Sequence, residues 1–199
     1  GRMTLFTSLL VCIGGVAADP APVPSGPQLD AAMQSVKVIY ADRASKAKTT
    51  SDRAALAREV FADRHATSTH AERYAIILAA LSLAEKGDDP LLLLTICDHA
   101  SEAFKVDGGR MFMERVNKTA GPIAAAAWPA LKERLEGIAT AYMGAQRFDD
   151  AVQLATVMAA LAKRARDPKA GSAAAALRKT VSERKKARDR YEELAKAAN

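Results

Sequence analysis

The sequence predicts an all-α protein of about eight helices arranged as antiparallel hairpins, and three observations lead to this prediction. Alanine dominates a hydrophobic content of 49%, while aromatic residues make up only 5%. Alanine is the best helix former and is depleted in strands. The 11 glycines and 8 prolines fall mostly between stretches in which apolar residues recur at helical spacing. With 199 residues and 26% charged side chains, the chain has room for one ordinary domain or two small ones, and its composition argues against wholesale disorder.

The first 18 residues have the features of a secretory signal peptide. The apolar run over residues 5–16 is too short to span a bilayer as a helix, and residues 16–18 are small, as signal peptidase requires. Because two residues precede Met3, either the true start of the chain lies upstream or these two residues are foreign. We therefore expect export to the periplasm, the cell envelope or the extracellular space.

Cys12 provides a minority alternative, in which the protein is a lipoprotein anchored through this cysteine. Val11 lies directly before it, where lipoproteins need a small residue, so cleavage of an ordinary signal peptide is the favoured prediction. Cleavage after residue 18 would leave Cys97 as the single cysteine, which excludes a disulfide within the mature chain.

The expected mature chain divides into a spacer and one helical domain. Residues 19–27 contain four prolines and predict an extended spacer. Residues 28–199 predict the helical domain, because apolar residues at helical spacing begin directly after the prolines. The polar last helix leaves open whether this domain continues past Asn199.

Three helices are predicted before residue 88. The first covers residues 29–48, and the second begins at Ser51, which has the hydroxyl of a good N-cap. Thr69 and Glu72 have the spacing of a capping box and predict the start of the third helix. Gly87 is predicted to end this third helix as a left-handed cap.

The fourth predicted helix runs to residue 104 and begins with the strongest start signal in the chain. Asp89 is an N-cap, and Pro90 takes the first helical position, where its missing N–H costs nothing. The run is longer than a typical strand, so we predict the second arm of a helical hairpin and not a strand or a membrane-seeking patch. One face of this helix carries Leu93, Ile96, Cys97, Ala100, Ala103 and Phe104.

The remaining helices are predicted at residues 104–118, 122–146, 147–165 and 168–199. Pro129 either kinks the second of these helices or marks its true beginning. Asp167 and Pro168 repeat the start signal of the fourth helix.

Two predicted turns resemble those of tetratricopeptide hairpins. In "AYMGAQRFDDAVQLA", Tyr142 lies in the first arm, Phe148 follows the turn, and Ala151 lies where the arms touch. Gly87 has the corresponding turn position in "LAEKGDDPLLLL". The spacing departs from the usual period of about 34 residues, so the resemblance implies a tetratricopeptide-like (TPR-like) right-handed array or bundle and not a consensus array.

A second resemblance is to a helical region of large exported proteins of planctomycete-type bacteria. There, an arginine-tyrosine helix start, a glycine-aspartate turn and a closing phenylalanine-x-valine-aspartate occur in this order. Together with "RAALAREVF" and "RFDDAVQLA", the resemblance spans residues 28–196 and departs from the pattern at residues 95–97 and 108–109. It implies a helical, exported region that is joined to other modules and has no established activity. The matching residues are Arg73, Tyr74, Ala84, Gly87, Asp88, Phe104, Val106 and Asp107.

The candidate chemical groups all have a simpler structural explanation. Cys97 and His99 resemble a nucleophile and base, but two residues on a helix are about 200° apart around its axis, so their side chains diverge. His65 and His70 flank a loop, yet zinc needs further ligands that lie on the next hairpin. No phosphate loop, nucleophile elbow or dinucleotide fingerprint occurs. The sequence therefore predicts no catalytic, cofactor-binding or metal-binding residues.

Two acidic pairs, at residues 88–89 and 149–150, also lie at predicted helix starts. Carboxylates are favourable there because they complement the helix dipole and the free amides. We therefore predict that both pairs stabilise helices and do not act as an acid and base pair.

The last predicted helix is basic, in a chain with net charge +6 and pI near 9.4. Carboxylates are interspersed at residues 183, 189, 192 and 193, which favours a solvated face with internal ion pairs. The thin apolar seam of this helix is compatible with a coiled-coil contact. The seam comprises Leu177, Val181, Tyr191 and Leu194, and the basic cluster comprises Arg184, Lys185, Lys186, Arg188 and Arg190.

These observations predict a non-enzymatic, exported helical module that binds or scaffolds a protein or peptide partner. Stacked hairpins leave a groove in which such a partner can lie. One alternative is an accessory domain of a larger secreted enzyme. Another is a binder of acidic cell-envelope polymers through the basic last helix, whereas nucleic acid is not favoured as a partner.

Overall fold

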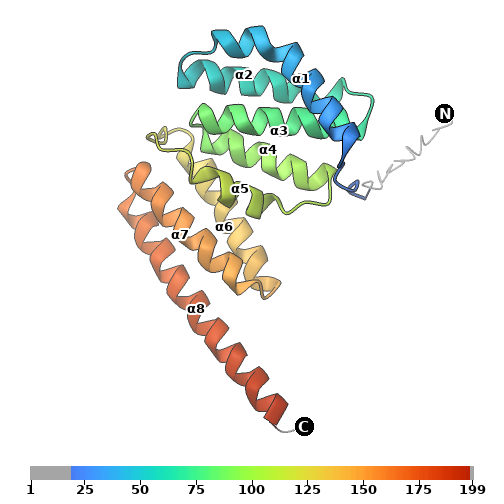
Figure 1. Cartoon of the computed structure of the whole chain (residues 1–199). Coiled ribbons are helices and arrows are strands. Elements are labelled where there is room, and N and C mark those ends of the chain that lie inside the picture. Colours follow the sequence, from blue (N-terminus) through green and yellow to red (C-terminus); the bar gives the residue numbers. More distant parts are fainter. Residues whose placement is uncertain (1–18, 198–199) are drawn as a thin grey trace, which may run out of the picture.

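The computed structural model describes residues 19–197, and every regular element within this range is helical (Figure 1), which confirms the predicted all-α class. In the described range there are eight α-helices and one short 3-10 helix, η1, between the second and third of them. They are α1 (Pro27–Lys46), α2 (Thr50–Ala62), η1 (Asp63–His65), α3 (His70–Lys86), α4 (Pro90–Ala103), α5 (Gly108–Val116), α6 (Trp128–Gly144), α7 (Phe148–Arg164) and α8 (Pro168–Ala197).

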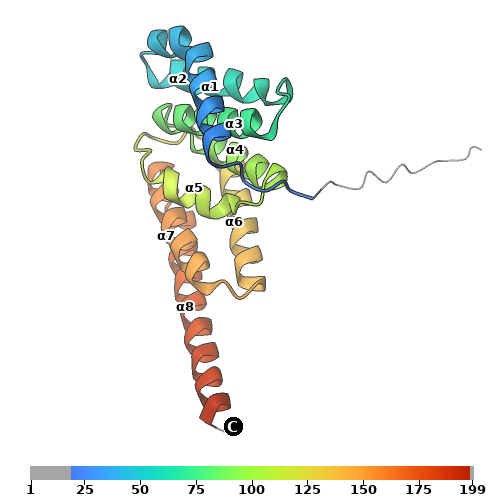
Figure 2. The same ribbon diagram turned by 45° about the vertical axis from the view of Figure 1, so that its right-hand side comes forward.

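The helices pack mostly against their neighbours in the sequence, so the molecule is elongated and not spherical. The helices α1 and α2 both contact α3, which pairs with α4, and α5 and α6 contact α4. The chain then continues through α6, α7 and α8, and α8 extends beyond the rest of the protein in both views (Figures 1 and 2). One continuous cluster of buried apolar side chains runs from Ala32 in α1 to Val181 in α8.

Most of the predicted N-caps agree with the structure, with one correction. The Asp89 carboxylate accepts from the Leu92 amide at 3.0 Å, and the predicted capping box of α3 is present. The predicted N-cap of α2, Ser51, is wrong, because Thr49 holds that position. Thr49 has an acidic residue three positions later, and its hydroxyl and the Asp52 carboxylate each accept an amide hydrogen bond at 3.0 Å.

The end of α3 differs from the prediction by one residue. Gly87 has φ −82°, and the left-handed residue is Asp88, with φ 56°. Gly87 is required for a different reason: a Cβ atom at this position would lie 2.6 Å from the backbone nitrogen of Ala54 in α2. The glycine therefore allows two helices to approach closely, and the aspartate makes the turn.

The same turn occurs three times among the described residues. A single left-handed residue with φ near 56° lies between α3 and α4, between α6 and α7, and between α7 and α8. In each turn the next amide donates to a carbonyl five residues earlier, at 2.8 to 3.2 Å, which is the pattern of a Schellman motif. The three left-handed residues are Asp88, Gln146 and Arg166.

Two further expectations are resolved in the second half of the chain. Pro129 occupies the first turn of α6 and marks its true beginning, so it does not kink a longer helix. The helix expected at residues 104–118 begins only at Gly108, because Phe104 is extended and fully buried. Asp107 caps this helix by accepting from the Arg110 amide at 2.9 Å.

The proline-rich segment is attached to the domain by one parallel β-bridge. Ala21 donates to the Ala103 carbonyl at 2.9 Å and accepts from the Lys105 amide at 2.8 Å. The predicted signal peptide, Cys12 included, lies outside the described residues. Within the described range, no helix combines the length and the apolar character that a membrane span requires.

Candidate functional site

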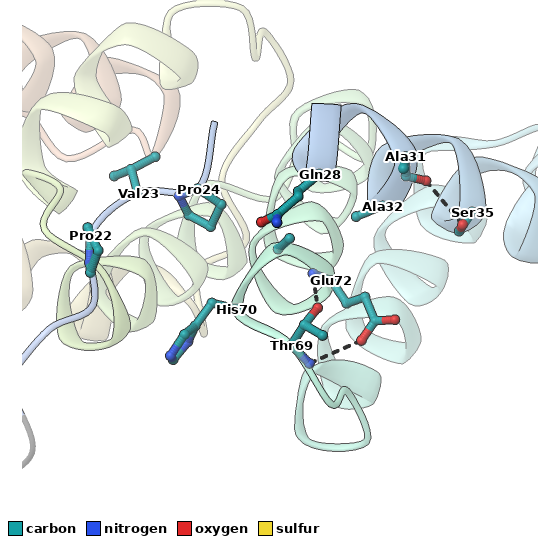
Figure 3. Close-up of a pocket in the computed structure, with 11 residues that line it drawn as sticks. Pro22, Val23, Pro24, Gln28, Ala31, Ala32, Ser35, Thr69, His70 and Glu72 are labelled. Carbon is teal, nitrogen blue, oxygen red and sulfur yellow. Dashed lines mark hydrogen bonds between the residues drawn. The ribbon is translucent and has the colours of Figure 1, made fainter. Parts of the chain in front are cut away.

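A groove of about 580 Å³ lies between the start of α1 and the start of α3 (Figure 3). One wall is the proline-rich segment that the Ala21 bridge holds in place. The opposite walls are the first turns of α1 and of α3. We call this hollow the α1–α3 groove; it is lined by Pro22, Val23, Pro24, Gln28, Ala31, Ala32, Ser35, Thr69, His70, Ala71 and Glu72.

A second hollow of about 350 Å³ continues the groove along α1. The two share Ala32, Ser35 and Glu72, and the second reaches Ile39, which is 63% exposed. The Glu72 carboxylate belongs to the capping box of α3, and its hydrogen bonds, chiefly from the Ser68 hydroxyl, lower the pKa of this carboxyl. The surface is therefore long, mostly apolar and built from small side chains.

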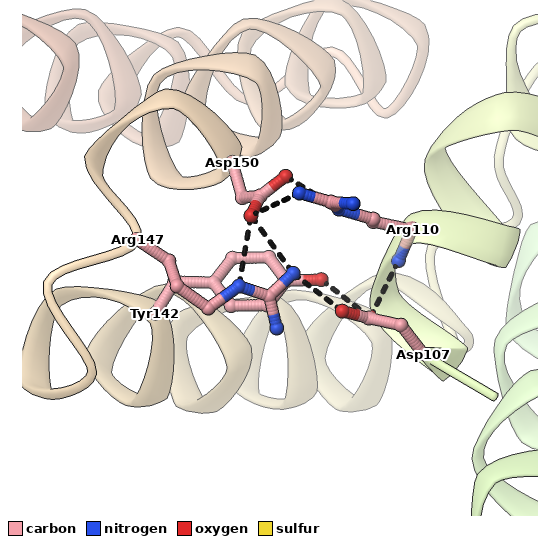
Figure 4. Close-up of polar contacts among 5 residues, drawn as sticks. All are labelled: Asp107, Arg110, Tyr142, Arg147 and Asp150. Carbon is pink, nitrogen blue, oxygen red and sulfur yellow. Dashed lines mark hydrogen bonds and ion pairs between the residues drawn. The ribbon is translucent and has the colours of Figure 1, made fainter. Parts of the chain in front are cut away.

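A polar network joins α5, α6 and α7 on another side of the molecule (Figure 4). Arg110 grips the Asp150 carboxylate with two hydrogen bonds of 2.8 and 3.0 Å, and Arg147 donates to the same group at 2.8 Å. These bonds, those from Arg110 first, hold the pKa of Asp150 below its usual value although the residue is buried. Tyr142 donates to Asp107 at 2.9 Å, and the Arg147 guanidinium stacks on the Tyr142 ring at 4.1 Å.

This network has the chemistry of a structural joint. Each carboxylate is already paired with arginine, and burial together with the hydrogen bond to Asp107 raises the pKa of Tyr142, so the phenol stays protonated. Neither a free nucleophile nor an unpaired base is present among these five residues. The arrangement fixes α5 against the α6–α7 hairpin.

Asp88 makes a second joint, at the left-handed position of the α3–α4 turn. Its carboxylate accepts from the amides of Ala120, at 2.8 Å, and of Gly121. Arg164, at the end of α7, pairs with Asp88 at 3.3 Å and donates to the Gly121 carbonyl at 2.8 Å. A side chain at position 121 would collide with this carboxylate, because a Cβ atom there would lie 2.0 Å from it.

The structure separates Cys97 and His99, as the helical spacing predicts. Cys97 is fully buried among apolar side chains, and burial raises the pKa of its thiol to about 12. The His99 ring instead accepts from Arg64 Nε at 3.2 Å and packs edge-on against Phe61. Burial, followed by the Arg64 charge, lowers the pKa of His99.

The two loop histidines do not converge either. The His65 ring lies 6.1 Å from that of His99, whereas the His70 ring packs on Phe104. In the part of the chain that the structure describes, no group of three or more His, Cys, Asp or Glu side chains has the arrangement of a metal site.

The acidic pairs have roles beyond the predicted helix capping. Asp89 is an N-cap as expected, but Asp88 and Asp150 are the acceptors of the two joints described above. Asp149 forms an ion pair with Lys185 of α8. These roles have no local pattern in the sequence, because Arg110 lies 40 residues from Asp150 and Arg164 lies 76 residues from Asp88 along the chain.

The helix α8 carries most of the net charge. It contains nine Lys and Arg and four Asp and Glu residues, so it contributes +5 to the net charge of +6. The predicted internal pairing is present in part, because Arg188 pairs with Asp189 at 3.1 Å and with Glu192 at 3.3 Å.

Searches of known protein-family models, curated proteins and solved structures found no match to this chain.

Proposed function

We propose that this protein is a non-catalytic, exported module of TPR-like helical hairpins that binds an extended segment of a partner protein in the α1–α3 groove. The observation that carries the proposal is the groove itself, an open, mostly apolar channel with one wall of prolines and two helical walls. From Gln28 to Ile39 the groove and the hollow that continues it follow α1 for about 16 Å at 1.5 Å per residue. That length accommodates about five residues of extended chain.

The groove chemistry favours a peptide with small aliphatic side chains. Alanines on α1 and α3 leave shallow, apolar positions along the groove. A large side chain of the bound peptide would not fit in these positions and would project into solvent. The Gln28 amide at the rim can both donate to and accept from a peptide backbone. Because the Ala21 bridge already holds the proline-rich segment in place, this segment loses little conformational entropy when a peptide binds.

The non-catalytic part of the proposal rests on the state of the reactive groups. Cys97 is buried with a raised pKa, and the carboxylates of both joints are occupied by arginine. The TPR-like part rests on the recurring turn, which makes successive helices antiparallel at three places in the described chain.

A matched pair of serine substitutions tests the proposal. Ser35 and Ser45 are both exposed on α1, and each hydroxyl bonds to a backbone carbonyl of the same helix, but only Ser35 lines the groove. Peptides would be selected from a random displayed library on the immobilised protein, and their affinities measured by fluorescence anisotropy. We expect Ser35→Trp to weaken the selected peptides at least about tenfold, because an indole fills the channel.

Ser45→Trp serves as the control and is expected to bind the same peptides as the original protein. Circular dichroism would establish that both variants keep their helix content. A library that yields no binder, or binders that ignore Ser35→Trp, would contradict the proposal.

A further inference from the structure

The helix α8 presents two different faces. One face packs on α7, where Ala174 and Val181 are buried and Lys185 pairs with Asp149. The contact ends near Arg188, which donates to the Gln146 carbonyl in the α6–α7 turn at 3.2 Å. Beyond this point α8 projects from the rest of the protein, as both views show (Figures 1 and 2).

A second stripe runs along α8 beside the packed face. Its members follow one another at alternating steps of three and four residues, which is the spacing of the a and d positions of a coiled coil. Tyr191 and Leu194, at its far end, are 74% and 65% exposed. We call this set the α8 stripe: Leu177, Thr180, Arg184, Ala187, Tyr191 and Leu194.

We propose that the α8 stripe is the interface of an antiparallel homodimer, in which α8 packs along α8 of a second copy. The a positions of the stripe are Leu177, Arg184 and Tyr191, and the d positions are Thr180, Ala187 and Leu194. A two-fold axis between residues 185 and 186 places each a position of one copy against a d position of the other, as antiparallel packing requires. Leu177 then meets the partner's Leu194, and Thr180 meets the partner's Tyr191. The two aromatic rings and four leucines become buried in the outer layers of the interface. Tyr191 and Leu194 are largely exposed within one chain, and Leu177, which packs partly on the core, lines a hollow beside Trp128 and Met158 that the partner's Leu194 can enter.

The centre of the interface contains Arg184 against the partner's Ala187. A small residue opposite leaves room for the aliphatic stem of the arginine, whose guanidinium can reach solvent at the edge of the helix pair. This layer lowers affinity and favours one register, because a shift by one heptad would place Arg184 against Leu194 or Thr180 and would lose both Leu177–Leu194 layers.

The distribution of charge along α8 indicates that the helix that covers the stripe is α8 of a second copy and that it runs antiparallel. Glu183 and Arg190 lie on the same flank of the stripe, and the register brings Glu183 to the partner's Arg190 twice, once on each side of the axis. Residues 177–187 carry five basic residues and one acidic residue, whereas residues 188–197 carry three of each. Parallel pairing would place the two basic halves together, but antiparallel pairing places each against a neutral half.

Sedimentation velocity over a range of protein concentrations tests this assembly. Glu183→Arg alone, or Arg190→Glu alone, converts two attractive pairs into two repulsive ones, so each is expected to weaken dimerisation about tenfold. The double variant, Glu183→Arg with Arg190→Glu, restores both pairs and is expected to dimerise like the original chain. Positions 183 and 190 are about 10 Å apart along one helix, so this rescue must come from contacts between copies.

Two controls repeat the same charge changes on the far side of α8. Glu193→Arg and Arg178→Glu are both exposed and lie outside the stripe, so they are expected to leave the dimer unchanged. A chain that stays monomeric at the highest soluble concentration would overturn the proposal, as would a double variant that remains as weak as the single ones. Because Ser35→Trp does not touch α8, its effect on peptide binding and the dimerisation results can fail independently.

Discussion

The helices α4 and α8 begin with the same two residues and then have different environments. In each, an aspartate before a proline accepts a hydrogen bond from the third amide of the helix, at 3.0 Å for Asp89 and 2.9 Å for Asp167. Six of the 14 residues of α4 are buried, compared with two of the 30 residues of α8. The α4 helix contacts helices on several sides, whereas α8 packs chiefly on α7.

The comparison shows that a cap determines where a helix begins but not what stabilises it. In α4 the leucines that follow the cap are held by surrounding helices, so the helix derives its stability from apolar burial. In α8 the corresponding positions are Lys169, Ala170, Gly171 and Ser172, and stability comes from the helix propensity of the alanines that follow, from α7 and from ion pairs along the surface. The second half of α8 therefore keeps a face that is free to bind.

The largest expected difference between the two helices concerns leucine truncation. Leu94 in α4 is fully buried and Leu194 in α8 is 65% exposed. Leu94→Ala is expected to lower the free energy of unfolding by about 2–5 kcal/mol, because it removes buried methyl groups and leaves a cavity. Leu194→Ala is expected to change it by less than about 0.5 kcal/mol. Urea unfolding followed by circular dichroism, at concentrations where the chain is monomeric, measures both, and equal losses would refute the comparison.

The local signals in the sequence predict the caps of α4 and α8, but not which residues take the left-handed position in the turns between the helices. Asp89 and Asp167 act through an amide three residues away, so a short window contains all the necessary information. Gln146 and Arg166 adopt left-handed conformations that these residue types seldom take, and the surrounding helices impose them. The assignment of the left-handed position to Gly87 failed for the same reason.

Contacts between distant segments explain what else the sequence analysis missed. The α1–α3 groove exists only because Ala21 pairs with a residue 83 positions later, which places the prolines beside α3. The Asp150 joint connects residues 40 positions apart. Neither arrangement has a local pattern in the sequence, although the concentration of alanine and serine on one side of α1 was a visible sign of an open face.

A second, smaller contrast comes from glycine positions beside the two helices. A Cβ atom on Gly108 would lie 2.6 Å from the Cys97 carbonyl oxygen of α4, whereas one on Gly171 of α8 would meet its nearest neighbour at 3.9 Å. Gly108→Ala is therefore expected to destabilise the protein by about 1–3 kcal/mol through overpacking. Gly171→Ala is expected to stabilise it by about 0.5–1 kcal/mol, because alanine is the better helix former. Thermal unfolding of both variants checks the opposite signs, and a shift in the same direction would contradict the close packing around α4.

The smallest expected effect tests the caps that the two helices share. Asp89→Ala is expected to cost about 1 kcal/mol, the usual cost of losing an N-cap acceptor. Asp167 also accepts from the indole N–H of Trp128, the single tryptophan, at 2.9 Å, so its loss has a spectroscopic signature. Asp167→Ala is expected to shift Trp128 fluorescence, and Asp89→Ala to leave it unchanged.

The same indole reports the pH dependence of the α8 cap. The hydrogen bond from Trp128, followed by that from the Ala170 amide, holds the pKa of Asp167 below its usual value. The contribution of the Asp167 carboxylate to stability is therefore fully present above the unfolded-state pKa of about 3.9. It is lost as the pH falls through the lower folded-state pKa. Trp128 fluorescence should change in that acid range while circular dichroism still reports intact helices, and Asp167→Asn should abolish the change. If the Trp128 emission of the original protein and of Asp167→Asn changed only together with loss of helix content, the signal would report global unfolding. The protonation of Asp167 would then have no effect of its own on the α8 cap.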